Sequence, residues 1–456
     1  MVVLVALAAC SSPPKATVRK PAGPDVDPEG PHADAVAQQV RPFVAGELVS
    51  GLVVGLYDAG KLEIYGFGKG PGGKPPNGRT LFDLGSITKV YTNLLLADAV
   101  QAKLVELDEP VSELLPPGVT VPTANQTPIT LRHLALHSSG LPRMPPSLVL
   151  RKTPPDPYAS YSEDALYQDL IVTQLDAPPG TRIVYSNYGT GLLGVALGRK
   201  LGGGYAQALA TRVLAPLGLR DTSFTVPAGA ASRKALGTDD DLQPTSRWTW
   251  GALAAAGGLI SSARDQLALI DAELDAAAGS KGTLRAQLRL TQETQLEGTT
   301  TDNAGLGWTI DSAGRYLHSG GSGGFRSFIG FDPKTKRGVV VLASSYTTLV
   351  DFLGTAMFDV LERTAKPPPP VPDEKLLALY AGTYDFSGTK LAVVASGKRL
   401  YLEGPGEPRH RMAPFGGEHT FWIEALQSAA RFDVTGGVVK SVQFKIGNNV
   451  VVAPRV

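Results

Sequence analysis

The sequence predicts an α/β chain, more strictly α+β, in which one antiparallel sheet flanked by helices draws its strands from two distant stretches. Two β-rich runs at 48–57 and 61–67 enclose Asp58-Ala59-Gly60 and predict a hairpin. Strand-like runs return only between 307 and 343. A stiff Pro-rich linker at 366–373 then precedes short strands and Gly-rich turns, which predict a separate small all-β domain.

Length and composition restrict the function classes. The chain has 456 residues, of which 43% are hydrophobic and 19% charged, so it is long enough for more than one domain. Its 43 basic and 42 acidic residues leave a formal charge of +1, which gives no argument for nucleic acid or an anionic membrane surface as partner. We expect a small-molecule or peptide substrate, and the oligomeric state stays open.

The first residues are typical of an export signal. An apolar run ends in Leu7-Ala8-Ala9-Cys10, and a stretch rich in Ser, Pro and Lys follows. The pattern resembles a bacterial lipoprotein signal without its basic start: residues 1–10 are the signal, Cys10 carries the lipid and 11–32 form a tether. An ordinary signal peptide is the alternative. On the lipoprotein pattern we expect an exported, lipid-anchored protein that faces the periplasm or the cell exterior. No run reaches the length of a transmembrane helix.

The first candidate for chemistry is the pair Ser86 and Lys89. Gly85 breaks the chain before a run at 86–100 whose apolar residues suit a buried helix. Residues three apart lie on one helix face, so the hydroxyl and the amine would be neighbours in the first turn. Burial that lowers the lysine pKa would make the serine a nucleophile. The Ser-x-x-Lys patterns at Ser12 and Ser387 lie in a Pro-rich leader and a predicted hairpin turn, and neither offers a helix.

The middle of the chain, from about 107 to 256, reads as helical pieces and Pro-rich loops, which predict a mainly helical lobe. His133 and His137 are four apart and could ligate zinc, but the glutamate of a metalloprotease helix is absent and no third ligand cluster follows. Packing or supporting roles suit them better. The Gly-rich run at 68–74 leads into Pro75-Pro76 rather than a helix, which excludes a phosphate-binding loop. We expect no metal and no cofactor.

Three short motifs occur in order: Ser86-x-x-Lys89, Tyr185-x-Asn187 and His318-Ser319-Gly320. They resemble the three motifs of penicillin-recognising serine hydrolases of the class C β-lactamase and D,D-peptidase type, over about 33–362. Further family landmarks support the resemblance, at 137–142, 256–262 and 305–308. It implies a β-lactamase-like/transpeptidase fold, with a hydrolase domain at 33–365, a cleft between lobe and sheet, and an accessory β-rich domain at 374–456.

The resemblance also implies roles for individual residues. Ser86 would attack a carbonyl carbon and form an acyl-enzyme, while Lys89 and Tyr185 would share proton transfer in a division that the sequence leaves open. The backbone N–H groups of Ser86 and Gly321 would form an oxyanion hole. Substrate binding would fall to residues of the second and third motifs: Asn187, His318, Ser319, Gly320 and Gly321.

A rival nucleophile is Ser322 in Gly320-Gly321-Ser322-Gly323-Gly324, which matches the nucleophile elbow of α/β-hydrolases. That motif requires a strand, a sharp turn and then a helix. Here the run at 325–331 reads as a strand, so we interpret Ser322 as a turn residue.

The substrate is the most open question. Many β-lactamases carry Lys-Thr-Gly as the third motif. Here the first residue of that motif is His318, and in this the chain resembles certain D,D-carboxypeptidases, D-aminopeptidases and esterase-like members of the family. D-amino-acid peptides or β-lactam-like amides are therefore the expected substrates, with an esterase or a catalytically silent wall-binding lipoprotein as alternatives. Arg326, on the next strand, bears on the choice: facing the cleft it would favour peptides with a terminal carboxylate, and facing solvent it would favour uncharged esters.

Overall fold

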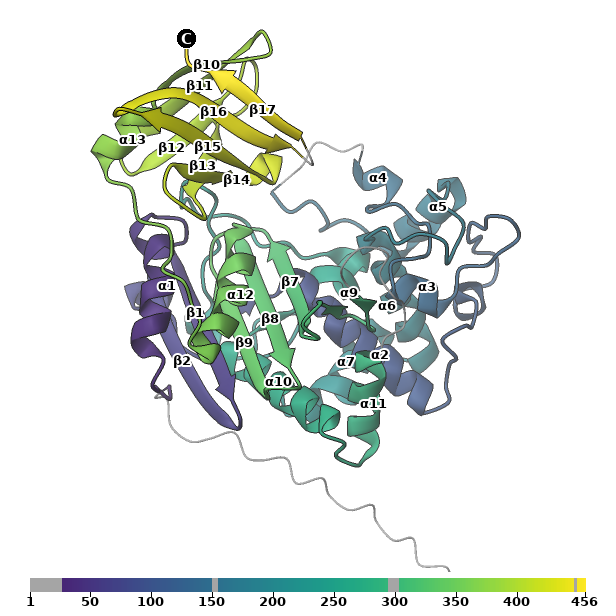
Figure 1. The fold of residues 1–456 in the computed structure, drawn as a ribbon. Helices are drawn as coiled ribbons and strands as arrows, with labels where there is room; N and C mark the ends of the chain where they lie inside the picture. Colours follow the sequence, from purple (N-terminus) through teal and green to yellow (C-terminus); the bar gives the residue numbers. More distant parts are fainter. Residues whose placement is uncertain (1–26, 150–154, 294–302, 447–448) are drawn as a thin grey trace, which may run out of the picture.

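The protein was analysed in a computed structural model that describes residues 27–149, 155–293, 303–446 and 449–456. Cys10 and most of the predicted tether lie outside the described residues. The chain folds into an α/β unit with a helical lobe on one side and a separate all-β unit at the C-terminus (Figure 1). Among the described residues, no helix is both long enough and apolar enough to cross a membrane.

A seven-stranded antiparallel sheet lies at the centre of the α/β unit, in the order β2-β1-β9-β8-β7-β6-β5. The predicted hairpin, β1 and β2, joins the late strands through β1 and β9, where Leu56 faces Val339. The sheet thus draws on two distant stretches, as predicted. The strands are β1 Gly51–Asp58, β2 Lys61–Gly68, β5 Asn303–Ala304, β6 Thr309–Ile310, β7 Tyr316–Ser322, β8 Phe325–Asp332 and β9 Arg337–Ala343.

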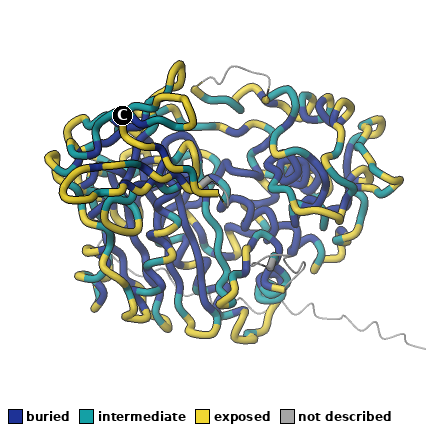
Figure 2. The backbone as a smooth tube through the Cα atoms, turned by 45° about the horizontal axis from the view of Figure 1, so that its top comes forward, coloured by how far each residue is buried: buried dark blue, intermediate teal, exposed yellow. Residues whose placement is uncertain are grey.

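Helices cover both faces of this sheet because β1 is apolar on both sides. Leu52 and Val54 pack in a core with α1 Ala33–Ala45 and α12 Leu349–Glu362. Val53, which alternation places on the other face, belongs to the core that includes α2 Thr88–Gln101 and α10 Ala263–Ala277. Figure 2 shows buried backbone along the strands and exposed residues mainly at their ends.

The predicted helical lobe is present beside the sheet. At its centre lies α6 Asn187–Leu201, whose glycines let neighbouring segments approach closely. A Cβ on Gly194 would lie 2.2 Å from Ala255 Cβ, and one on Gly198 would lie 2.3 Å from Tyr205 N. The other helices here are α3 Leu131–Ala135, α4 Pro146–Val149, α5 Glu163–Val172, α7 Gly204–Leu209, α8 Ala215–Leu217 and α9 Ala254–Gly257, with α11 Thr283–Gln292 nearby. A short antiparallel pair, β3 Phe82–Asp83 and β4 Ile260–Ser261, joins the segment just before Gly85 to the segment that follows α9.

The C-terminal unit is all-β, as predicted, and forms a near-closed barrel. Eight antiparallel strands follow one another in sequence order from β10 to β17, and Tyr384 on β10 bridges to Arg455 beyond β17. Ser387 and Gly388 form the turn between β10 and β11, as predicted. The barrel comprises α13 Glu374–Tyr380, β10 Gly382–Phe386, β11 Thr389–Ser396, β12 Arg399–Glu403, β13 His410–Pro414, β14 Thr420–Ile423, β15 Ser428–Thr435, β16 Val438–Ile446 and β17 Asn449–Pro454.

Charged side chains of the barrel hold three loops of the α/β unit. The buried guanidinium of Arg411 donates to the backbone oxygens of Gly46 and Glu47 on one loop and of Asp240 on another, at 2.7 Å each. On a third loop, Glu424 accepts from Thr348 N and Oγ1, both at 2.9 Å. This third loop connects β9 to α12, so the barrel contacts the segment that follows a central strand.

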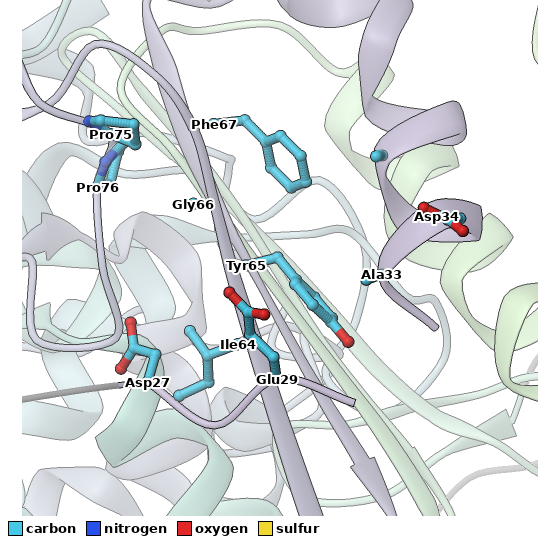
Figure 3. Close-up of a pocket in the computed structure, with 11 residues that line it drawn as sticks. Asp27, Glu29, Ala33, Asp34, Ile64, Tyr65, Gly66, Phe67, Pro75 and Pro76 are labelled. Atoms are coloured by element: carbon cyan, nitrogen blue, oxygen red, sulfur yellow. The ribbon is translucent and has the colours of Figure 1, made fainter. Parts of the chain in front are cut away.

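The last residues of the predicted tether, 27–32, pack against the α/β unit. Ile64 N donates to Pro28 O at 2.8 Å, and Asp27 pairs with Arg264 at 2.8 Å. His32 binds the buried carboxylate of Glu63 at 2.9 Å, because a buried charge requires a partner. Asp27 and Ile64 line a cavity of about 480 Å3 along β2, whose lining residues include none of the predicted site residues (Figure 3).

Candidate active site

The nucleophile turn is built by close approach of two glycine segments. Gly85 has φ +53°, and a Cβ on it would lie 2.5 Å from Gly321 O. A Cβ on Gly320 would lie 2.0 Å from Leu84 O and 2.8 Å from Ser86 N. Glycine at both positions therefore lets β7 lie directly against the turn at Gly85–Ile87, which continues into α2. Ser86 is partly exposed at this junction.

Lys89 lies one turn further along, with Nζ 3.1 Å from Ser86 Oγ, as the spacing predicted. The side chain is 1% exposed, and Nζ also donates to Asn187 Oδ1 at 2.8 Å and Ala256 O at 2.7 Å. Burial, and next the charge of Arg143, lower the pKa of Lys89 well below its ordinary value. A neutral amine has two N–H groups, which donate to Asn187 Oδ1 and Ala256 O. Its lone pair is then free to accept a hydrogen bond from the hydroxyl of Ser86.

Tyr185 completes the group, directly before α6. Its hydroxyl hydrogen-bonds Ser86, and Lys89 Nζ lies 4.7 Å from its ring centroid. Burial raises the pKa of Tyr185, so the phenol keeps its proton near pH 7. Ser186 caps α6 by accepting from Gly189 N at 2.8 Å and donates to Pro142 O at 2.7 Å, which fixes the backbone at Tyr185.

Asn187 is the first residue of α6 and contacts Lys89. Its Oδ1 accepts from Lys89 Nζ at 2.8 Å, and its Nδ2 lies 3.4 Å from Met144 Sδ. The amide thus orients Lys89, and the thioether on Nδ2 is a weak acceptor that a substrate could replace.

The third motif lies on β7, opposite the helical lobe. His318 Nδ1 donates to Ser319 O at 2.7 Å. Desolvation, and next the charge of Lys89, lower the pKa of His318 to about 4, so this imidazole is neutral near pH 7. Ser319 Oγ accepts from Arg326 Nη2 at 3.2 Å. The structure thus brings all three motifs together around Ser86, with His318 contributing no permanent cation.

The rival nucleophile and the zinc hypothesis find no support in the geometry. Ser322 is buried at the end of β7, and a turn at Gly323-Gly324 leads into strand β8 rather than a helix. His133 Nδ1 accepts from Thr130 N at 3.2 Å in a capping box, and His137 Nδ1 accepts from Ser186 N at 3.2 Å. Within the described ranges, no group of three or more His, Cys, Asp or Glu side chains is placed to hold a metal ion.

This arrangement agrees with a comparison of the sequence with known families. A family model described as Beta-lactamase matches residues 36–362. The chain belongs to the β-lactamase family. It is a serine hydrolase, and the barrel strands from β10 onward lie beyond the family match.

Relatives of this β-lactamase-family protein carry two kinds of name. It is 29% identical over 275 residues to the D-alanyl-D-alanine-carboxypeptidase/endopeptidase AmpH of Escherichia coli strain K12, covering 57% of this chain and 70% of AmpH. It is 28% identical over 352 residues to a β-lactamase of the same strain, covering 68% and 88%.

The solved structures that resemble this chain are likewise described as a β-lactamase or as a D-alanine carboxypeptidase. A class C β-lactamase from Rhodobacter sphaeroides superposes with a TM-score of 0.62 at 28% identity, covering 73% of this chain and 99% of that one. A β-lactamase/D-alanine carboxypeptidase from Yersinia pestis superposes with a TM-score of 0.61 at 25% identity, covering 72% and 99%. The β-lactamase/transpeptidase fold predicted from the three motifs is therefore confirmed.

Sequence reasoning missed two residues that lie next to Tyr185 and Gly321. Arg143 directly follows the landmark at 137–142 and lies 4.9 Å above the ring of Tyr185. Tyr346 follows β9, and its ring would lie 2.5 Å from a Cβ on Gly321. Extending the landmark by one residue would have found Arg143, whereas no local pattern marks Tyr346.

Proposed function

We propose that this β-lactamase-family protein cleaves D-amino-acid peptides with a free terminal carboxylate, through an acyl-enzyme on Ser86. The observation that carries the proposal is the placement of Arg326. Its guanidinium is mostly buried on the sheet side and donates to Ser319 Oγ at 3.2 Å, so it faces the third motif rather than solvent. A Cβ on Gly321 would lie 3.2 Å from Arg326 Nη1, which places this cation within reach of a group held over β7.

The protonation states of Lys89 and Tyr185 determine which of the two accepts a proton and which donates one. With Lys89 as a neutral amine, it accepts the proton of Ser86 Oγ as that oxygen attacks the carbonyl carbon. Ser86 N and Gly321 N, brought together by the glycine contact, stabilise the oxyanion. Tyr185, a phenol near pH 7, donates its proton to the leaving nitrogen and recovers one from Lys89. Water then attacks the acyl-enzyme by the reverse sequence.

The terminal carboxylate would accept hydrogen bonds from Ser319 Oγ and from the Arg326 guanidinium, which lie side by side. Asp351 balances this cation, accepting from Arg326 Nε at 2.8 Å and also from Nη2. A charge-assisted hydrogen bond contributes about 1.5–3 kcal/mol, or roughly 10- to 100-fold in rate or affinity. A neutral His318 adds no second charge, so we expect slow turnover of cephalosporins.

The test compares a D-Ala-D-Ala peptide with its C-terminal carboxamide. We expect the wild type to prefer the acid by about tenfold or more in kcat/KM, and Arg326→Gln to lose that preference. Arg326→Lys keeps the charge and should retain part of it. Hydrolysis of an uncharged p-nitrophenyl ester, which does not need the carboxylate contact, reports that each variant is folded. Equal rates on acid and carboxamide in the wild type would refute the peptide assignment.

A second candidate is an esterase. The neutral His318 favours it, because uncharged esters need no cation on β7. A wild type that turns over p-nitrophenyl esters rapidly and D-Ala peptides not at all would select it. A silent wall-binding protein is disfavoured by the contacts among Ser86, Lys89 and Tyr185.

We also propose export as a lipoprotein through Cys10, on the sequence pattern Leu7-Ala8-Ala9-Cys10. Expression in a bacterium fed radiolabelled palmitate should label the full chain, and Cys10→Ala should abolish the label. Equal labelling of both proteins would exclude lipidation at this cysteine.

A further inference from the structure

A second arginine lies beside Tyr185, whose hydroxyl hydrogen-bonds Ser86. Arg143 comes from the helical lobe, is exposed, and has its guanidinium carbon 4.9 Å from the ring centroid of Tyr185. Its backbone oxygen accepts from Asn187 N at 2.9 Å and Tyr188 N at 3.4 Å. The loop is thereby tied to the start of α6, so the position of Arg143 is set by the second catalytic motif.

The charge of Arg143 has no acidic partner among the residues that the structure describes. Arg326 differs, because Asp351 binds its guanidinium. The nearby Asp156 accepts instead from Thr249 N at 3.0 Å and Oγ1 at 2.7 Å. An unbalanced cation so close to a catalytic amine opposes protonation of Lys89, and it also attracts anions to the mouth of the site.

The partly exposed Tyr158 and Trp248 and the buried Trp250 lie next to this cation. The field of Arg143 reaches Tyr158, whose ring stacks on Trp250 at 4.8 Å and meets Trp248 edge-on at 5.4 Å. A Cβ on Gly323 would lie 2.8 Å from Trp248 Nε1, so this platform runs from the lobe to the β7–β8 turn. The lobe side of the site thus offers one cation beside aromatic rings.

We propose that Arg143 binds a carboxylate on the acyl side of the substrate, so the enzyme prefers acidic acyl donors. The inference rests on the proposed acyl-enzyme at Ser86 and extends it. Arg326 on the sheet receives the carboxylate of the leaving residue, and Arg143 on the lobe receives one carried by the acyl residue. The substrate class is a D-peptide whose acyl residue bears a carboxylate side chain.

The test uses two esters that differ only on the acyl side: mono-p-nitrophenyl glutarate, a carboxylate, and p-nitrophenyl glutaramate, its carboxamide. We expect the wild-type ratio of kcat/KM, glutarate over glutaramate, to fall about fivefold or more in Arg143→Gln. Arg143→Lys should keep most of the ratio. Arg41→Gln removes an exposed charge from α1, across the sheet, and should leave the ratio unchanged.

A second readout separates the role of the charge from a structural one. Arg143→Gln removes a cause of the low Lys89 pKa, so the acidic limb of the pH–rate profile should move to higher pH for both esters alike. An unchanged ester ratio in Arg143→Gln, or an equal fall in Arg41→Gln, would overturn the inference. Ester hydrolysis that survives Ser86→Ala would instead overturn the proposed function. The two failures can be distinguished, because one is tested at Ser86 and the other at Arg143.

Discussion

Ser86→Ala is expected to abolish acyl-enzyme formation and to lower hydrolysis of p-nitrophenyl esters by about 10⁴-fold or more. The substitution removes the attacking oxygen and leaves the turn intact, because Ser86 is partly exposed and the contacts of Gly85 and Gly320 do not involve its side chain. Stability should change by about 1 kcal/mol or less. Steady-state kinetics and thermal unfolding of the purified variant measure the two quantities.

Ser322→Ala is the matched control, since Ser322 is the rival serine on the neighbouring strand. Its Oγ is buried without a hydrogen-bond partner among the described residues, so its loss should leave activity near the wild-type value. Unchanged turnover in Ser86→Ala together with a loss in Ser322→Ala would move the nucleophile to the end of β7.

Lys89→Ala is expected to slow acylation by about 10²- to 10⁴-fold, because it removes both the proton acceptor and a group that positions Asn187. Lys89→Met fills the buried space without an amine and should be equally slow, which separates chemistry from a cavity effect. Stopped-flow acylation by a chromogenic ester measures the step. Wild-type rates in Lys89→Met would exclude the lysine as the base.

The pH dependence follows from the direction of the Lys89 shift. Since its pKa lies well below the ordinary lysine value, the active neutral amine persists to lower pH and is lost only as pH falls through that lowered pKa. Acylation should therefore decline on the acidic side. If the acylation rate instead rises only as the pH passes the ordinary lysine pKa, Lys89 is protonated at neutral pH.

Much of the fold and the three motifs could be predicted because their signals are local. The spacing of Ser86 and Lys89 fixes a shared helix face, and the strand-like runs between 307 and 343 predict the strands that carry His318 and Arg326. The turn at Ser387 and the strand after Gly324 were also predicted from their own neighbourhoods, which excluded two false nucleophiles.

What the sequence left open depends on distant contacts. Asn187 binds Lys89, 98 residues away, and this contact makes its amide a positioning group before any substrate arrives. The position of Arg143 depends on hydrogen bonds between its loop and the start of α6. The packing of residues 27–32 depends on the contact of His32 with the buried Glu63. Nothing in a local pattern encodes these pairings.

The most direct test of the acyl-enzyme mechanism is to identify the residue modified by a fluorescent penicillin. The purified protein would be labelled, digested and examined by tandem mass spectrometry. The account predicts a covalent adduct on Ser86, formed in the wild type and absent in Ser86→Ala. An adduct on Ser322, or on any other residue while Ser86 stays unmodified, would contradict it.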